Sequence, residues 1–270
     1  METASTLATF LRARRELVKP ADVGLPDSDR RRVEGLRREE VAMLAGISTE
    51  YYLRLEQGRD HQPSDQVLEA LARALQLDED ATSYLRDLAR PQPHRHRRSA
   101  PERFDPAVQS LIDSWPTTAA FVLNRNLTIL ASNGVARCLS RFFVPGENIL
   151  RAIFLEPELR MVYRDWEAMT TRVVPFLRAV LGADPPNREM FELVGELSIA
   201  SERFRMLWAR HDVKHRSTGP ALFYHPQVGP LDLHYTIMHL SDQRQMLVTY
   251  HADPGSSSEE KLCLLASLTS

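Results

Sequence analysis

The stretch LRREEVAMLAGISTEYYLRLEQGR limits the possible folds of this chain more than any other segment. Val41, Ala42 and Leu44 supply an apolar face for one short helix. Gly46 can adopt the positive φ that a sharp turn needs, and Ser48 can cap a following helix by accepting a backbone N–H bond. The segment therefore predicts two short helices joined by a tight turn, which is the helix-turn-helix motif.

Four side chains at the start of the second helix should point away from the core, because Tyr52 and Leu55 face inward one turn apart. These four are Thr49, Glu50, Tyr51 and Arg54. In a helix-turn-helix, the N-terminal end of the second helix enters the DNA major groove and contacts base edges. The segment therefore indicates a sequence-specific DNA-binding domain.

Residues 1–90 resemble the phage-repressor class of helix-turn-helix, often called the XRE family. The matching parts are REEVAMLAG, the Ser48 cap, RLEQGR followed by PS, and the helix EALARAL. Family members pair an arginine of the first helix with the glutamate of the LExG turn. The resemblance therefore implies a structural salt bridge between Arg15 and Glu56 that does not read DNA.

The same resemblance implies that Thr49, Glu50 and Arg54 read bases. Arg54 can donate a bidentate pair to guanine O6 and N7, worth roughly 1–3 kcal/mol of discrimination. Glu50 either accepts a hydrogen bond from cytosine N4 or orients Arg54, and Tyr51 can contact a thymine methyl group.

Three arginines at helix ends would contact phosphates and give affinity without sequence information: Arg37, Arg38 and Arg59. The alternative for Arg37 and Arg38 is a solvated helix surface beside Glu39 and Glu40. Between the first two helices lies PADVGLPDSDRRRVEG, an insertion that the minimal family lacks. Its three arginines either reach DNA or belong to a disordered loop.

The organisation of the chain changes after residue 90. The polar stretch PQPHRHRRSAPER at residues 91–103 has no apolar periodicity and predicts an interdomain linker. Beyond it, AAFVLNRNLTILASN predicts a β-hairpin, and a long amphipathic helix follows that Pro175 should kink or interrupt. PALFYH, LDLHYTIMHL and QMLVTYHA predict further strands. We therefore expect an all-α helix-turn-helix domain at residues 1–90 and an α+β domain at residues 104–270.

Residues 104–270 resemble the ligand-binding domain of the MmyB-like regulators, a PAS-like module found behind this helix-turn-helix in actinobacteria. The matching segments are PTTAAFVLNRNLTILASN, EPELRMVYRDWEAM, LVGELSIASERFRMLWARHDV, HPQVGPLDLHY and LVTYHADPGS. The sequence departs from the family pattern at Ser132-Asn133 and at Glu147-Asn148. The resemblance implies a PAS-like fold and an apolar ligand such as a fatty acid.

Nine residues are candidates to line the ligand pocket or to bind a ligand carboxylate. They are Phe121, Leu123, Asn133, Phe154, Trp166, Phe176, Arg205, Trp208 and His211. Asn133, Arg205 and His211 are the candidate donors to a carboxylate. The alternative is that the aromatic residues form an ordinary core, and that the domain serves dimerisation or partner binding without a ligand.

Several other function classes lack their motifs. The sequence has no GxSxG, P-loop, HExxH or dinucleotide fingerprint, so we expect neither an enzyme nor a cofactor. His211 and His215 share no identifiable third ligand, so we expect no metal site. The first residues do not resemble a signal peptide, and no apolar run approaches the roughly 20 residues that span a bilayer. Cys138 and Cys263 are too few for a disulfide framework and fit a cytoplasmic protein.

The expected partner is double-stranded DNA, bound by a homodimer. Two-fold pairing places two recognition helices about one DNA turn apart and multiplies the discrimination of a small module. The net charge of −2 does not bear on this expectation, since local patches set the field that a phosphate backbone meets.

Overall fold

The structure is a computed structural model of the chain, and its internal packing forms two compact units. It describes residues 2–26, 33–59, 63–89, 104–183, 188–240 and 245–267. The predicted linker and the three arginines of the insertion, Arg30–Arg32, lie outside these residues. The first unit comprises residues 1–95, 173–186 and 205–215. The second unit comprises residues 96–172, 187–204 and 216–270.

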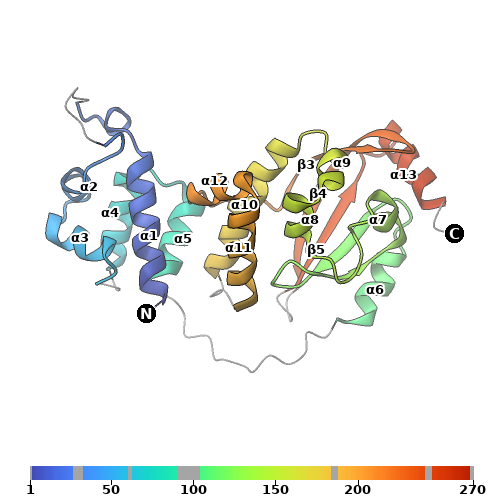
Figure 1. Cartoon of the computed structure of the whole chain (residues 1–270), viewed down its shortest axis with the longest axis horizontal. Coiled ribbons are helices and arrows are strands. Elements are labelled where there is room, and N and C mark those ends of the chain that lie inside the picture. Colours follow the sequence, from blue (N-terminus) through green and yellow to red (C-terminus); the bar gives the residue numbers. More distant parts are fainter. Residues whose placement is uncertain are drawn as a thin grey trace. The chain divides into compact units, whose positions relative to one another are not determined.

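The N-terminal part of the first unit is helical, as predicted (Figure 1). Its elements are α1 (Glu2–Leu17), the 3-10 helix η1 (Pro20–Val23), α2 (Arg38–Ala45), α3 (Thr49–Glu56), α4 (Asp65–Ala74) and α5 (Glu79–Ala89). Apolar side chains spaced by three and four residues give each long helix one buried face. On α1 this face is Leu7, Phe10 and Leu11, which pack against Leu68 and Leu85 in a single hydrophobic core.

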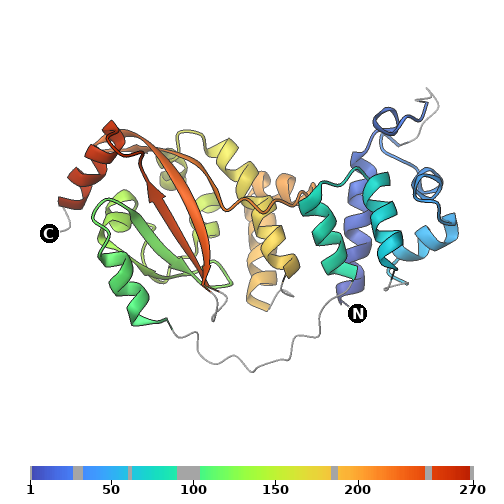
Figure 2. The same ribbon diagram turned by 180° about the vertical axis from the view of Figure 1, so that it is seen from behind.

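The second unit contains an antiparallel five-stranded sheet in the order β2-β1-β5-β4-β3. Figures 1 and 2 show this sheet from opposite sides. Its strands are β1 (Ala119–Leu123), β2 (Ile129–Ser132), β3 (Thr218–His225), β4 (Gly229–Leu240) and β5 (Gln245–His251). The predicted β-hairpin is the β1–β2 pair. The fold class expected from the sequence, a helical domain followed by an α+β domain, is therefore confirmed.

Alternation along β1 directs its side chains to the two faces of the sheet. Ala120 and Val122 lie on one face, where Ile112 of α6 (Pro106–Asp113) and Leu247 of β5 complete a small buried cluster. Phe121 lies between them in the sequence and therefore points to the opposite face. The two faces of the sheet therefore pack against different side chains.

The second unit also contains helices, two of which continue into the first unit. They are α6 (Pro106–Asp113), α7 (Gly134–Leu139), α8 (Ile149–Leu155), α9 (Pro157–Val162), α10 (Trp166–Ala183), α11 (Arg188–Ala200), α12 (Glu202–Ala209) and α13 (Ser257–Ser267). None of the described helices is long and apolar enough to cross a membrane.

One of the two alternatives expected for the long amphipathic helix, an interruption at Pro175, is wrong. The helix is not interrupted at Pro175, which lies inside α10. The interruption comes earlier, where Tyr163 forms a β-bridge with Phe223 and Asp165 caps α10 by accepting a bond from the Ala168 N–H. A proline removes one backbone donor, which the rest of an 18-residue helix tolerates, whereas a bridge to a strand requires extended backbone.

Candidate nucleic-acid interface and ligand-binding unit

The turn between α2 and α3 has the geometry that the sequence predicts. Gly46 has a φ of 67° and ends α2 in the left-handed conformation, which favours glycine. Ser48 is extended, and its Oγ accepts a hydrogen bond of 3.1 Å from the Tyr51 N–H. The apolar face of α2 differs from expectation at one position, because Leu44 is exposed while Val41 and Ala42 are buried.

The recognition helix α3 buries one side and exposes the other. Tyr52 and Leu55 are fully buried, as expected from their spacing. Thr49, Glu50 and Arg54 are exposed. The half-buried Tyr51 lies beside Arg54, whose guanidinium carbon is 5.6 Å from the centre of the tyrosine ring.

That stacking orients Arg54 through Tyr51. The exposed side of α3 therefore presents an orienting aromatic ring, a guanidinium, a carboxylate and a hydroxyl on one accessible surface. These groups can donate to or accept from base edges.

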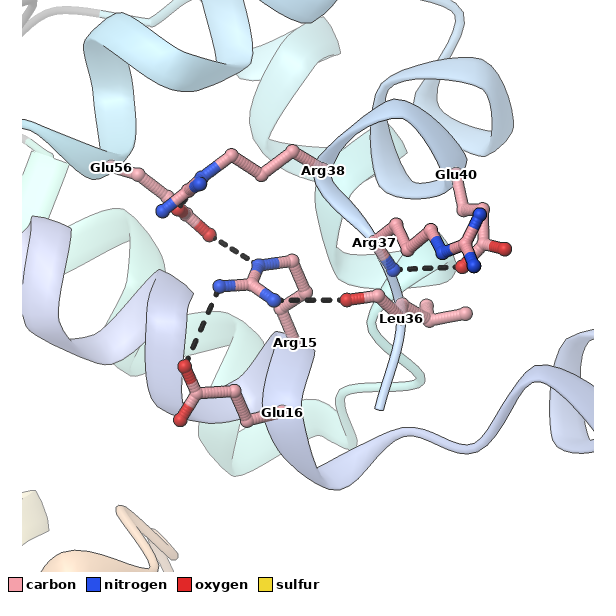
Figure 3. A network of polar contacts seen from close by, with 7 residues as sticks. All are labelled: Arg15, Glu16, Leu36, Arg37, Arg38, Glu40 and Glu56. Atoms are coloured by element: carbon pink, nitrogen blue, oxygen red, sulfur yellow. Dashed lines mark hydrogen bonds and ion pairs between the residues drawn. The ribbon is translucent and has the colours of Figure 1, made fainter. Parts of the chain in front are cut away.

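A buried carboxylate attaches α3 to two other helices (Figure 3). The side chain of Glu56 has no exposed surface. Its Oε1 accepts a 2.6 Å bond from Arg15 Nε of α1, and its Oε2 accepts a 2.6 Å bond from Arg38 Nε of α2. Arg15 also donates from Nη1 to the Leu36 carbonyl at 2.9 Å. The structure thus contains the pair implied by the resemblance and adds a second arginine to it.

Opposing effects set the ionisation of Glu56. Burial acts to raise the pKa of this carboxyl group, but the hydrogen bonds from Arg15 and Arg38 outweigh it, so the pKa lies below its usual value. Burial also raises the pKa of the neighbouring Tyr52 hydroxyl well above its usual value. Glu56 is therefore ionised at neutral pH, and Tyr52 is neutral.

The three arginines predicted to contact phosphates occupy different environments. Arg37 is half-buried at the start of α2, where its backbone N–H donates to Glu40 Oε2 at 2.7 Å. Arg59 is exposed just after the end of α3. Arg38 is partly exposed, but its Nε is already committed to Glu56. A phosphate contact of Arg38 would therefore use only the rest of its guanidinium group.

The aromatic face of the sheet in the second unit carries a cluster of five rings. They are Phe121, Phe143, Tyr163, Phe223 and Tyr250, all buried, with neighbouring ring centres 4.7 to 6.1 Å apart. The hydroxyls of Tyr163 and Tyr250 are 3.3 Å apart and form the polar centre of this cluster. Burial raises the pKa of Tyr250 to about 12, so both hydroxyls stay protonated. Of these five, sequence reasoning identified only Phe121, although alternation along β3 was a usable signal for Phe223.

Three further predicted pocket residues lie in the second unit. Leu123 is buried at the end of β1. Phe154 packs edge-on against Trp166 and against Phe204, with ring centres 6.1 and 5.1 Å apart. Trp166 donates from its indole N–H to the Ile153 carbonyl at 2.9 Å. These contacts are those of a packed core.

Asn133 has a structural role that conflicts with ligand binding. Its Oδ1 accepts from the N–H groups of Ala120 and Ala136, both at 3.0 Å. Its Nδ2 donates to the carbonyls of Ile112 and Thr118 at 2.9 and 2.8 Å. Because an amide group has two N–H donors, no donor remains for a ligand carboxylate. Asn133 instead caps α7 and joins it to β1.

The other four predicted pocket residues, Phe176, Arg205, Trp208 and His211, belong to the first unit. Arg178 donates to the Trp208 carbonyl at 2.5 Å and stacks its guanidinium 3.8 Å from the centre of the Trp208 ring. The ring of His211 lies 6.4 Å from that of Phe10. The nine candidates are therefore divided between two units and do not form one lining within either.

Within the part of the chain that the structure describes, no group of three or more His, Cys, Asp or Glu side chains could hold a metal ion.

Comparison with known families agrees with this arrangement. Residues 6–85 match the model of a helix-turn-helix domain, which contains α2, the Gly46 turn and α3. Residues 104–265 match the model of the MmyB-like transcription regulator ligand binding domain. No curated protein matches the chain.

These observations define a class of protein, a ligand-responsive transcription regulator with a helix-turn-helix DNA-binding domain. Since the second match covers more than half of the 270 residues, the chain belongs to the MmyB-like transcription regulator ligand binding domain family.

Replacing Glu56 tests how much the buried ion pairs stabilise the protein. In Glu56→Gln the Arg15 guanidinium stays buried without a carboxylate, so we expect the free energy of unfolding to fall by roughly 3 kcal/mol. Urea unfolding of the full chain, followed by far-UV circular dichroism, measures it. The matched control is Glu69→Gln, which removes a half-exposed pair with Arg86 and should change the value by less than about 0.5 kcal/mol. Equal effects of the two substitutions would contradict the proposed stabilising role.

The stabilisation by Glu56 should also depend on pH. A carboxylate whose folded-state pKa is lowered stabilises the fold above its unfolded pKa, and this contribution disappears as the pH falls through the folded pKa. The ordinary pKa of a glutamate carboxyl group, which applies in the unfolded chain, is 4.5. The difference in unfolding free energy between wild type and Glu56→Gln should therefore be constant near neutral pH and shrink below that value. Unfolding curves taken between about pH 7 and about pH 3 measure it, and a constant difference throughout would refute the assignment.

Proposed function

We propose that this chain is a sequence-specific DNA-binding regulator whose second domain responds to an apolar small molecule. The observation that carries the DNA-binding part is the exposed side of α3, whose opposite side is attached to α1 and α2 through the buried Glu56. A recognition surface must be rigid, because each flexible side chain or helix loses entropy on binding. The ion pairs of Glu56 with Arg15 and Arg38 supply that rigidity.

Thr49, Glu50, Tyr51 and Arg54 are the proposed base-reading residues. Stacking on Tyr51 limits the conformations of Arg54, which favours a planar bidentate contact with guanine. Arg37 and Arg59 are proposed to bind phosphates, and Arg38 adds to this field from its position beside Glu56. The protein is proposed to act in the cytoplasm as a homodimer on a two-fold DNA site, since one such module buries little surface.

A fatty acid or a similar apolar molecule is the proposed ligand. The family match describes a ligand-binding domain, and the aromatic cluster around Tyr163 and Tyr250 offers an apolar environment with one polar centre. Such a composition suits a ligand with an apolar body and a single hydrogen-bonding group. Binding and regulation, and not catalysis, are the proposed activities of this domain.

Selection of bound genomic fragments tests the base-reading proposal. Wild type should enrich an inverted repeat, and Arg54→Ala should lose that site while keeping weak, salt-sensitive binding. The loss expected at the contacted guanine is about 1–3 kcal/mol, or roughly 5- to 150-fold in affinity. Arg86→Ala, an exposed arginine of α5, is the matched control and should enrich the same site as wild type. The assignment of α3 fails if Arg54→Ala also enriches that site.

Organic extraction of the purified protein, followed by mass spectrometry, tests the ligand proposal. The extract should contain a stoichiometric apolar molecule, and adding back a long-chain fatty acid should stabilise the stripped protein. At 100 times the dissociation constant, a single site adds about 2.7 kcal/mol to the free energy of unfolding. An empty extract with no stabilisation by fatty acid would favour the alternative, a DNA-bound scaffold whose second domain dimerises or binds a protein.

A further inference from the structure

The first unit contains two segments that lie far from the helix-turn-helix in the sequence. Residues 173–186 and 205–215 are part of the region that matches the ligand-binding domain. Nevertheless, Ala179 and Val213 belong to the same buried core as Phe10 of α1. The core of the DNA-binding unit is therefore completed by side chains from the ligand-binding region.

Ionic and polar contacts reinforce this packing. Arg14 of α1 binds Asp212 through Nη1 and Oδ1 at 3.1 Å, and both side chains are largely buried. Lys214 pairs with Asp78, and the backbone N–H of the next residue, His215, donates to Asp80 at 3.0 Å. The segment 211–215 is thus held along the start of α5 and along α1.

The position of Arg14 connects this contact to the recognition helix. Arg14 and Arg15 are consecutive on α1, so their side chains leave the helix about 100° apart. Arg14 reaches Asp212, whereas Arg15 reaches Glu56 at the end of α3. A displacement of Asp212 would therefore act on the same turn of α1 that positions the recognition helix.

Some of the described buried polar atoms around the Arg14–Asp212 contact have no hydrogen-bond partner. Among the described residues, buried polar atoms without a hydrogen-bond partner include Arg14 Nε, Arg178 Nε and His211 Nδ1. His211 has a φ of 52°, in the left-handed region that residues other than glycine adopt in only a few per cent of cases. Buried polar atoms without a partner and an uncommon backbone conformation both raise the free energy of the closed contact, so opening it costs less. Uncommon backbone conformations are also found at switch regions.

We propose that Asp212 is a positioning residue that couples the ligand-binding region to the recognition helix, through Arg14, α1 and the Arg15–Glu56 pair. α12 begins at Glu202 in the second unit and ends at Ala209 in the first, shortly before Asp212, so the chain itself connects the second unit to this contact. The inference rests on the proposed DNA-binding function, and it adds the residue by which that function is regulated.

Hydrogen exchange of the full-length protein, with and without its selected DNA fragment, tests the coupling without requiring a known ligand. Coupling is reciprocal, so DNA bound at α3 must affect the segments that Asp212 connects to it. In wild type, DNA should slow amide exchange at residues 173–183 and 205–215 by about five-fold or more. In Asp212→Asn this effect should disappear, although the fragment is still bound.

Two variants separate coupling from simple packing. Arg210→Gln removes the other partner of Asp212, an exposed arginine whose Nε lies 3.0 Å from Oδ2, and it should keep the DNA effect. Asp212→Glu keeps the charge and should restore at least part of the effect that Asp212→Asn loses. A purely structural role would instead lower stability equally with and without DNA.

The outcomes of the hydrogen-exchange experiment distinguish a failure of the coupling role from a failure of the DNA-binding proposal. If DNA slows exchange in these segments as strongly in Asp212→Asn as in wild type, or not at all in wild type, the coupling role is refuted while the DNA-binding proposal stands. If wild type binds no fragment, the proposed function itself fails, and the coupling inference fails with it.

Discussion

The DNA-binding unit depends on the two ion pairs that the buried Glu56 carboxylate forms with Arg15 and Arg38. A fully buried carboxylate is costly unless cationic donors replace the lost water, and here two guanidinium groups do so. Because Arg15 comes from α1 and Arg38 from α2, one desolvated charge joins three helices. The end of α3 is therefore attached to both α1 and α2, while its exposed side carries the proposed base-reading side chains.

The helix-turn-helix is not self-contained in this chain. Its core takes Ala179 and Val213 from the region that matches the ligand-binding domain, and α1 is paired with Asp212. Hydrophobic burial and an ion pair therefore connect what the sequence presents as two successive domains. A sensor that contributes to the core of its own DNA-binding unit can influence that unit without a separate docking surface.

The buried sheet face of the second unit is held by aromatic packing, in contrast to the buried ion pairs of the first unit. Its sheet carries a cluster of aromatic rings whose only described direct polar contact is the hydroxyl pair of Tyr163 and Tyr250. In contrast, the amide of Asn133 is entirely used in joining α7 to β1. In this unit the Asn133 amide thus holds the backbone, whereas the hydroxyls of Tyr163 and Tyr250 lie within the apolar centre.

The sequence by itself determined the features that depend on near neighbours. The helix-turn-helix, the Ser48 cap and the hairpin follow from spacing and capping within a few residues. Tertiary structure decided that Arg38 shares Glu56, that Asn133 is a structural cap, and that the long helix breaks at Tyr163 and not at Pro175. It also divided the predicted pocket residues between two units. The reason is physical: these outcomes depend on hydrogen bonds and packing between residues far apart in the sequence, which local spacing does not encode.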